Sequence, residues 1–406
     1  MIKDYFNDIN NCIEIYQKRY RNTPKRGAFR VAVWSLQYLL TGRKIIDEED
    51  FHPCFKPDIR ENELSVLFLL AGGYGDYLLF ANYLSYFLER FVQKKVKVYI
   101  GYHISSAKTI FNYNIENVTF VDVREVSINP ENFDMAFHFC VVPKLLYADD
   151  KKIKEISVLL YQYLGLCQKY YKENQLILEK HPALDGWGSC KSIALGIKRI
   201  QEPDIYSYLG ISEKYKYRIL IEEDERKYLE SIGLVEQQYI AIHRGWDGTS
   251  PSNVKAWSEK SCGDLIPKLK EKYPEYKLVL FGSDRGQAPK NISGLDIDLI
   301  GKTSLEQVKV LLKNAVVLID NEGGMVHLRH ALGAKPSIVL FGPTSHKLFG
   351  YSENINLNAG VCDHFCEWLT KDWPLRCPKG DGVPCMEAIT TADVLAAFDL
   401  VIAKGK

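Results

Sequence analysis

The chain has 406 residues, 46% of them hydrophobic, and a formal net charge of +1 at pH 7. This length favours two domains, and the composition is that of an ordinary globular protein. A charge so close to zero argues against a general affinity for nucleic acid. The N-terminus, Met1-Ile2-Lys3-Asp4, leads into polar sequence without the apolar segment of a secretory signal. We therefore expect a cytoplasmic protein whose cysteines are not paired in disulfides.

Residues 1–60 precede the first convincing strand and form a predicted N-terminal helical extension. Basic side chains flank its apolar run, Val31 to Leu40. One interpretation is a basic surface that contacts anionic lipid at the periphery of a membrane, or a second subunit of a homo-oligomer. We favour a solvated cap packed on the first domain, because an acidic run at once offsets the charge: Asp47, Glu48, Glu49 and Asp50.

The first buried strand is predicted at Ser65 to Ala71, where the sequence is continuously apolar. A turn, Gly72-Gly73-Tyr74-Gly75-Asp76, follows it, and the apolar spacing after the turn predicts an amphipathic helix. Leu64 to Leu88 could pass for a membrane span, but the glycines and Asp76 in its middle exclude that. A strand, a glycine-rich turn and a helix are a common anion-binding layout.

Further apolar runs predict strands at 96–100, 118–121 and 133–139 and a helix at 153–164. We place a domain boundary near Lys216. The second domain opens with a strand at 239–243, followed by a loop that contains Arg244 and leads to Lys255. A strand at 277–281 then ends at Gly282, and a helix is predicted at 305–312. Repeated strand–helix units of this kind predict a doubly wound α/β domain.

The stretch from Val316 to Thr344 carries the most chemistry. A short buried strand leads into the polar turn Glu322-Gly323-Gly324, then a helix, a second strand and the turn Gly342-Pro343-Thr344. Both turns are expected at the carboxyl edge of a parallel sheet, where ligands bind. The free amides at the helix start suit an anion, and the carboxylate of Glu322 suits a sugar hydroxyl. This stretch therefore predicts a site for a nucleotide diphosphate-sugar.

The same stretch resembles glycosyltransferase family 9, the heptosyltransferases of bacterial lipopolysaccharide. That family reads Asp-Thr-Gly-x-x-His-Leu, and this chain reads Glu322-Gly323-Gly324-Met325-Val326-His327-Leu328. Ala331-Leu332-Gly333 and Phe341-Gly342-Pro343-Thr344 continue the match without a gap. Gly75-Asp76-Tyr77-Leu78 resembles the family's Gly-Asp-x-Leu, and Lys255-Ala256-Trp257 its Lys-x-Trp. The departure, Glu-Gly for Asp-Thr, keeps the charge and loses a hydroxyl.

The resemblance implies the GT-B architecture, two doubly wound Rossmann-like domains facing a central cleft. The acceptor domain would occupy residues 61–215 and the nucleotide-sugar domain 216–385, and a C-terminal helix in 387–406 would cross back to the first domain. The implied activity is that of an inverting glycosyltransferase. It would move a sugar, above all heptose from ADP-heptose, to a glycan, glycolipid or protein hydroxyl. The alternative is an inactive binding or assembly protein that kept the fold, which the Glu322-Gly323 departure favours and the retained Asp76 and Lys255 oppose.

In the family, the aspartate that matches Asp76 is the proposed catalytic base, and no metal is expected for the chemistry. Lys255 would meet the donor diphosphate as a point charge, although without the resemblance it is interpreted as a solvated lysine. His327 either reaches a phosphate or the ribose, or is a satisfied structural histidine. The full predicted donor set is Lys255, Arg244, Gly282, Glu322, Gly323, Gly324, Met325, His327, Gly342 and Thr344.

Four of the ten cysteines gather near the end of the chain: Cys362, Cys366, Cys377 and Cys385. Prolines and glycines between them make residues 360–386 loop-like. A loop with little apolar content needs a cross-link or a bound metal ion to stabilise it. Four thiolates offer a tetrahedral structural site for zinc or iron. Some family 9 members resemble this, with a cysteine-rich finger in the same place. A pair of disulfides, which a reducing cytoplasm disfavours, and four incidental thiols are the other interpretations.

Overall fold

A computed structural model describes most of the chain in two compact units. The described residues are 53–92, 94–104, 107–111, 115–139, 143–180, 217–243, 254–283, 293–334, 336–362, 365–367, 373, 375–378, 380 and 382–405. Residues 1–52 of the predicted helical extension lie outside this set, and so does Arg244. Within this set, no helix is both long and apolar enough to span a membrane.

The smaller unit comprises residues 1–56 and 123–129. Its described part is a parallel pair of two-residue strands, β1 (Cys54–Phe55) and β5 (Ser127–Ile128). The larger unit comprises residues 57–122 and 130–406 and contains two separate sheets.

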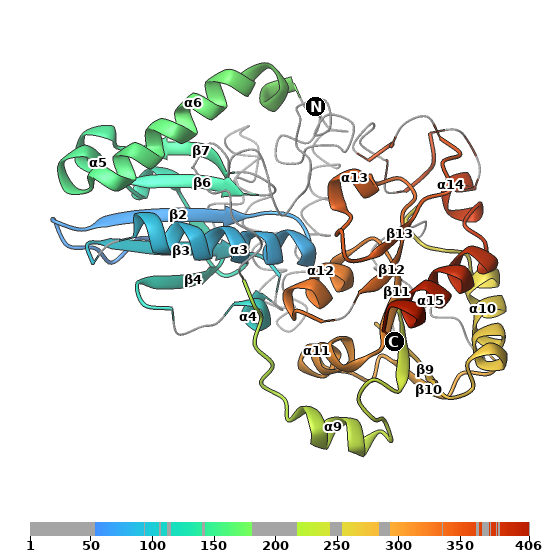
Figure 1. Ribbon diagram of the computed structural model, residues 1–406. Coiled ribbons are helices and arrows are strands. Elements are labelled where there is room, and N and C mark those ends of the chain that lie inside the picture. The colour runs from blue at the N-terminus through green and yellow to red at the C-terminus, as the bar shows by residue number, and fades with distance from the viewer. Residues whose placement is uncertain are drawn as a thin grey trace, which may run out of the picture. The chain divides into compact units, whose positions relative to one another are not determined.

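The first sheet has the strand order β4-β3-β2-β6-β7 (Figure 1). Its strands are β2 (Leu64–Leu70), β3 (Val96–Tyr102), β4 (Val118–Asp122), β6 (Met135–Phe139) and β7 (Pro143–Ala148). The first four are parallel, as predicted, and each begins within two residues of its predicted position. The sequence did not reveal β7, which runs antiparallel at the edge and exposes part of its surface.

Helices cover this sheet and close an aromatic core around Phe68. They are α3 (Tyr74–Phe91), α4 (Ala107–Ile110), α5 (Asp150–Ile156) and α6 (Val158–Lys180), with a 3-10 turn at Pro130–Asn132. The ring of Phe68 lies 5.3 Å from that of Phe80 and 5.1 Å from that of Phe87, both on α3. Such ring pairs add to the burial energy of the core.

The single helix predicted at 153–164 is two helices, α5 and α6, divided at Ser157. The Ser157 amide donates to the carbonyl of Ile153 and so closes α5. Its hydroxyl accepts from the amide of Leu160 at 3.3 Å and caps the start of α6. A serine that can satisfy free amides favours a break at this position over a continuous helix.

The second sheet is wholly parallel, with the order β10-β9-β8-β11-β12-β13. Its strands are β8 (Tyr239–His243), β9 (Lys277–Gly282), β10 (Ile297–Ile300), β11 (Val317–Asn321), β12 (Ser337–Leu340) and β13 (Ile355–Leu357). The helices of this half are α9 (Glu225–Ser231), α10 (Glu259–Lys272), α11 (Leu305–Asn314), α12 (Gly324–Ala331), α13 (His346–Phe349), α14 (Pro384–Glu387) and α15 (Thr391–Gly405).

Both faces of the second sheet are buried, which confirms the predicted doubly wound arrangement. On β8, Ala241 packs into one hydrophobic cluster together with residues of α11 and α12. Its neighbours Ile240 and Ile242 pack into a second cluster with residues of α10 and α15. Because side chains alternate along a strand, two buried faces require a continuous apolar run, and such a run predicted this strand from the sequence.

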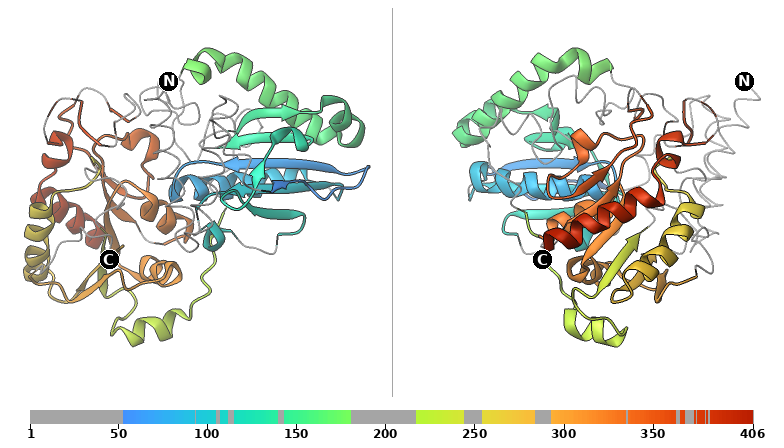
Figure 2. Two further views of the ribbon diagram at one scale, coloured as in Figure 1. Left: turned by 180° about the vertical axis from the view of Figure 1, so that it is seen from behind. Right: turned by 45° about the vertical axis from the view of Figure 1, so that its right-hand side comes forward.

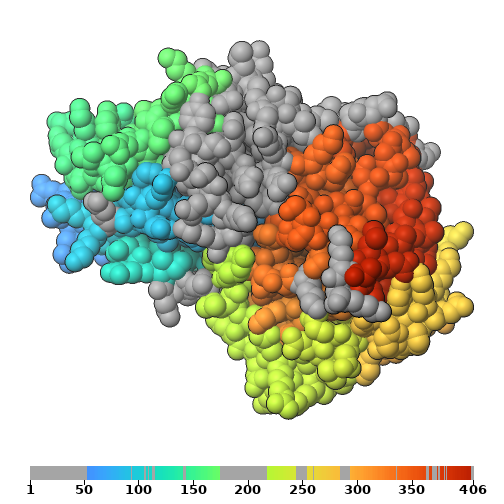
Figure 3. Space-filling model, in the orientation of Figure 1, coloured from blue at the N-terminus to red at the C-terminus, as the bar shows by residue number. Residues whose placement is uncertain are grey.

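The last helix, α15, packs on the second sheet. It contacts α10, β12 and β13, and the ring of Phe398 lies edge-on to that of Tyr273 at 4.6 Å. Figure 2 shows α15 running beside α10, and in Figure 3 the two helices form one continuous surface. These contacts bury the apolar face of α15 against α10 and the sheet, and the expected crossing back to the first domain stays a prediction.

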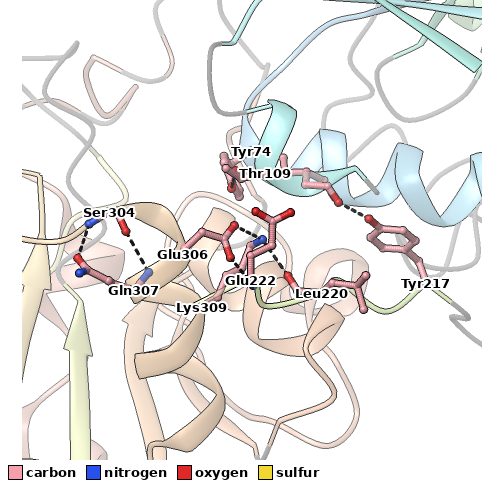
Figure 4. A network of polar contacts seen from close by, with 10 residues as sticks. Tyr74, Thr109, Tyr217, Leu220, Glu222, Ser304, Glu306, Gln307 and Lys309 are labelled. Carbon is pink, nitrogen blue, oxygen red and sulfur yellow. Dashed lines mark hydrogen bonds and ion pairs between the residues drawn. The ribbon is translucent and has the colours of Figure 1, made fainter. Parts of the chain in front are cut away.

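The segment 217–222 leads from the first half into the second and is tied to both. The Tyr217 amide donates to Oδ1 of Asn82 on α3 at 3.1 Å. Figure 4 shows the other end of this segment on α11, where buried Lys309 donates to the Leu220 carbonyl at 2.9 Å and to Glu306 at 2.5 Å. These bonds begin next to the predicted boundary at Lys216.

Candidate active site

Two glycine-rich turns, one from each large sheet, meet at the starts of α3 and α12. A Cβ atom added to Gly75 would lie 2.6 Å from Cδ2 of His327, and one added to Gly324 would lie 2.9 Å from Cβ of Tyr74. At contacts this short, a Cβ atom at either position would force the facing side chain to shift, so the two helix starts approach this closely because both residues are glycine. Asp76 is thereby brought beside residues that lie about 250 positions later in the chain.

Asp76 closes the first turn of α3. Its Oδ2 accepts from the amide of Gly73 at 2.7 Å, the reciprocal contact of a capping box. Gly72, with a φ of +89°, makes room for this carboxylate, because a Cβ there would overlap it. Burial raises the pKa of Asp76, although the Gly73 amide, His327 and Lys255 all favour its ionised form. The carboxyl group therefore belongs to a polar cluster as well as to a helix cap.

Lys255 and Glu322 form the closest charge pair of this cluster. Lys255 Nζ lies 2.6 Å from Oε2 of Glu322, and their side chains are 25% and 7% exposed. Burial alone would raise the pKa of Glu322, but the charge of Lys255 and the contact with His327 hold it well below its usual range. Nζ also lies 5.6 Å from the ring centre of Trp373. This geometry is that of a held ion pair, not of a solvated lysine.

His327 lies between these groups and is 4% exposed. Its Nδ1 lies 2.7 Å from the hydroxyl of Tyr351, and its Nε2 lies 3.8 Å from Oε1 of Glu322. Tyr351 is itself buried, and its ring stacks on that of His330 at 3.7 Å. The Nδ1 atom of His330 lies 2.5 Å from Glu353. No sequence pattern singled out Tyr351, because it lies 24 residues after the histidine that it contacts.

The other predicted donor residues fall into two groups. Gly323, Gly324 and Met325 lie at the start of α12, where Gly323 is the N-cap and no side chain caps the helix. Thr344 follows β12, and its Oγ1 is buried with no hydrogen-bond partner among the described residues. Free amides and an unsatisfied hydroxyl at this edge are suited to an anionic or hydroxylated ligand.

Gly282 and Gly342 have packing reasons of their own. A Cβ on Gly342 would lie 2.5 Å from Sδ of Met386 and 3.2 Å from Sγ of Cys385. One on Gly282, where φ is +154°, would lie 3.3 Å from Ile300 and 3.6 Å from His243. Both glycines therefore allow neighbouring side chains to pack against the ends of their strands, whether or not a ligand also contacts them.

Sequence reasoning missed a second histidine–carboxylate pair at the same sheet edge. His243 Nδ1 lies 3.0 Å from Oδ2 of Asp320, at the ends of the neighbouring strands β8 and β11. Burial raises the pKa of Asp320, and His243 opposes that rise. Each residue is visible in the sequence as a polar end to an apolar run, but their pairing depends on β8 and β11 being adjacent, which the sequence alone does not reveal.

The four C-terminal cysteines lie near one another as free thiols. Burial raises the pKa of Cys366 and of Cys385 to about 11 each, and neighbouring thiols of the set contribute to both shifts. Among the described residues, no three His, Cys, Asp or Glu side chains form a ready metal-binding group. The segment is braced on the donor-side turn, because the amides of Cys366 and Glu367 donate to the carbonyl of Pro343 at 3.0 and 3.2 Å.

Comparison with known proteins identifies a family to which part of the chain is similar. The model of glycosyltransferase family 9 (heptosyltransferase) matches residues 203–369. Lipooligosaccharide heptosyltransferase 2 of Haemophilus influenzae is 30% identical over 79 residues, which are 17% of this chain and 22% of that protein. Lipopolysaccharide heptosyltransferase 2 of Escherichia coli is 28% identical over 101 residues, 23% of this chain and 28% of that protein. The matched segments thus span about a quarter of these curated relatives.

Solved structures share the architecture over most of the chain. The dodecameric iron-containing heptosyltransferase TibC, in complex with ADP-D-beta-D-heptose, is 13% identical with a TM-score of 0.54, covering 86% of this chain and 78% of TibC. A glycosyltransferase family 9 protein of Veillonella parvula is 14% identical with a TM-score of 0.52, covering 85% and 99%. At these identities the likeness concerns the fold alone, and it confirms the predicted GT-B fold of two Rossmann-like sheets. The family resemblance found in the motifs is also confirmed over residues 203–369, which match the model of glycosyltransferase family 9.

Proposed function

We propose that this protein is an inverting glycosyltransferase that moves heptose from ADP-heptose to a hydroxyl of a bacterial surface glycan. The observation that carries the proposal is the meeting of the two glycine-rich turns. It places an acidic residue of the first sheet, Asp76, in one cluster with Lys255, Glu322 and His327 of the second. A transferase needs a base for one substrate beside a cation for the other, and this cluster contains both.

In the proposed reaction, Asp76 accepts the proton of the acceptor hydroxyl as its oxygen attacks the anomeric carbon. The bond from that carbon to the diphosphate breaks, and the diphosphate leaves as an anion from the opposite face. Lys255 and the amides of Gly323 and Gly324 stabilise the negative charge that develops on it. A raised pKa suits Asp76 to this task, because a more basic carboxylate takes up a proton more readily.

The donor and acceptor are inferred from relatives. TibC is described in complex with ADP-D-beta-D-heptose, and the two curated relatives are named as heptosyltransferases of lipooligosaccharide and lipopolysaccharide. Glu322 and His327 would then contact the ribose or base. A glycolipid or protein hydroxyl is the next acceptor class. We place the reaction in the cytoplasm, at the periphery of the inner membrane, and expect a homo-oligomer, since TibC is dodecameric.

We also propose one structural zinc or iron ion at the four C-terminal cysteines. Four neighbouring thiols, none of them in a disulfide, have the donor chemistry of such a site, and TibC contains iron. Cys362, Cys366, Cys377 and Cys385 would hold the ion. When bound, it stabilises the fold of the loop, and the transfer reaction does not pass through it.

Calorimetric titration against ADP-heptose, ADP and a panel of other nucleotide sugars tests the proposal. Binding of ADP-heptose in preference to the panel, with heptose transfer to a core-glycan acceptor, is expected. Binding without transfer to any acceptor would favour the inactive binding or assembly protein, to which the Glu322-Gly323 departure points. Preference for another nucleotide sugar would keep the enzyme class and replace the donor.

A further inference from the structure

We propose that Glu322 exchanges partners when the donor binds, passing from Lys255 to His327, and that Tyr351 is the positioning residue that aims His327 for this exchange. The inference rests on the proposed function, because it takes Lys255 as the cation that meets a diphosphate. It adds a role for Tyr351, which no sequence motif indicated.

The carboxylate of Glu322 is already placed between two partners. Its Oε2 lies 2.6 Å from Nζ of Lys255, a strong charge-assisted contact. Its Oε1 lies 3.8 Å from Nε2 of His327, inside ion-pair range and beyond hydrogen-bond length. A shift of about 1 Å would therefore replace the first contact by the second.

A diphosphate on Lys255 gives Glu322 a reason to move. The negative side chains of Glu322, Glu367 and Asp76 already act on this one ammonium. Phosphate oxygens added beside a carboxylate in a largely buried site would raise the repulsion between like charges. Departure of Glu322 relieves that repulsion only where the carboxylate finds another donor, because an unpaired buried carboxylate is costly.

Tyr351 decides whether His327 is that donor. A carboxylate only accepts hydrogen bonds, so Nε2 must carry the proton to bind Glu322. In the neutral imidazole Nδ1 is then an acceptor, and the hydroxyl of Tyr351, 2.7 Å away, donates to it. The stacking of Tyr351 on His330 at 3.7 Å fixes the ring that carries this hydroxyl.

The test measures the affinity of inorganic pyrophosphate for the full-length protein, since this probe has no sugar that Glu322 could contact. Tyr351→Phe keeps the ring and removes the hydroxyl, and should weaken binding about fivefold, the equivalent of one ordinary hydrogen bond. Glu322→Gln should strengthen binding about tenfold, because it removes the competitor for Lys255. In the Glu322→Gln background, Tyr351→Phe should have no effect. Tyr239→Phe is the matched control, a buried tyrosine whose hydroxyl donates to the Leu311 carbonyl.

An equal loss from Tyr351→Phe in both backgrounds would mean a general structural role and would overturn the exchange. If Tyr351→Phe weakens pyrophosphate binding in neither background, the exchange is also overturned. Should Tyr351→Phe fail to fold, His327→Leu removes the second partner directly and must show the same dependence on Glu322. Lys255→Ala separates this inference from the proposed function. If it binds pyrophosphate as the parent does, the assignment of Lys255 to the diphosphate fails and the exchange fails with it. If only the Tyr351 dependence is absent, the exchange alone fails.

Discussion

At the residue scale, Asp76 has two tasks that substitutions can separate. Its Oδ2 caps α3 through the Gly73 amide, which is a structural role, and its carboxylate lies in the cluster of Lys255 and His327, which suits a base. An amide oxygen can still accept from the Gly73 amide, whereas an amide cannot take up the acceptor's proton.

Asp76→Asn should keep the fold and the donor affinity and lower turnover by at least about a hundredfold, the usual scale of a lost general base. Asp76→Ala should lose turnover and also about 1 kcal/mol of stability, because the cap is gone. Turnover, thermal melting and ADP binding check both variants. Near-normal turnover of Asp76→Asn would remove Asp76 from the chemistry.

The pH profile follows from the direction of the Asp76 shift. Burial raises the pKa of Asp76, and a base acts in its deprotonated form, so activity should rise with pH through that raised value. The acid limb of kcat/KM should therefore lie above the position expected for an ordinary aspartate. Lys255 favours the ionised form, so Lys255→Ala should move the limb to still higher pH. A limb that stays in place in the variant contradicts this coupling.

Lys255→Ala should weaken donor binding at least about tenfold and leave acceptor binding nearly unchanged, because it removes the cation nearest to the proposed diphosphate. Lys270→Ala is the matched control, since it breaks another lysine–carboxylate pair of the same half, with Asp296 at 2.8 Å. Calorimetry with ADP measures the donor affinity of both variants. Equal donor affinity in Lys255→Ala and the parent would limit Lys255 to a structural ion pair.

At the element scale, the contact between the starts of α3 and α12 depends on glycine. The functional groups of the two sheets are close because Gly75 and Gly324 present only backbone to the facing helix. A methyl group on either would separate the turns that assemble the cluster, so this contact is as important for the site as any charged side chain.

Gly75→Ala should therefore lower stability and weaken ADP binding, because its Cβ would lie 2.6 Å from the imidazole of His327. Gly263→Ala is the contrasting variant, since a Cβ inside α10 would have no atom within 4 Å. At position 263, the better helix propensity of alanine should raise the stability of the protein by at most about 1 kcal/mol. Melting curves and calorimetry compare the two, and a harmless Gly75→Ala would show that the helix starts can separate without loss.

At the scale of the whole molecule, the cysteine segment connects several parts of the second half. It is bonded to the turn after β12 through Pro343, Cys385 packs on Gly342, and the segment leads into α14 and α15. A segment with so little apolar content gains its order from such contacts and, in our proposal, from a metal ion.

Purified, reduced protein should contain about one equivalent of zinc or iron by elemental analysis. Cys377→Ser should lose the metal and lower the melting temperature, because metal binding energy is folding energy for this loop. Cys54→Ser, which changes an exposed cysteine outside the set, should do neither. Absence of metal together with two bridged pairs in non-reducing mass spectrometry would replace the metal by disulfides and argue against the cytoplasmic assignment.

Local sequence determined the elements that are buried on both faces. β2, β8, β11 and β12 are mostly apolar runs, as expected for strands that are covered on both sides. Three of the edge strands, β7, β10 and β13, are partly exposed and lack such runs, and they were not predicted. The turns, too, were legible, because glycine and acidic residues at a strand end have a local chemical meaning.

Only the tertiary structure decided which of these features meet. The contacts of His327 with Tyr351 and of His243 with Asp320 join residues that are far apart in the chain. The packing of α15 against α10, β12 and β13 was likewise decided by which apolar surfaces the fold brings together. Periodicity describes one element at a time, whereas strand order and helix packing depend on the free energy of the whole fold. The candidate residues are therefore visible in the sequence, and their assembly into one cluster is a property of the fold.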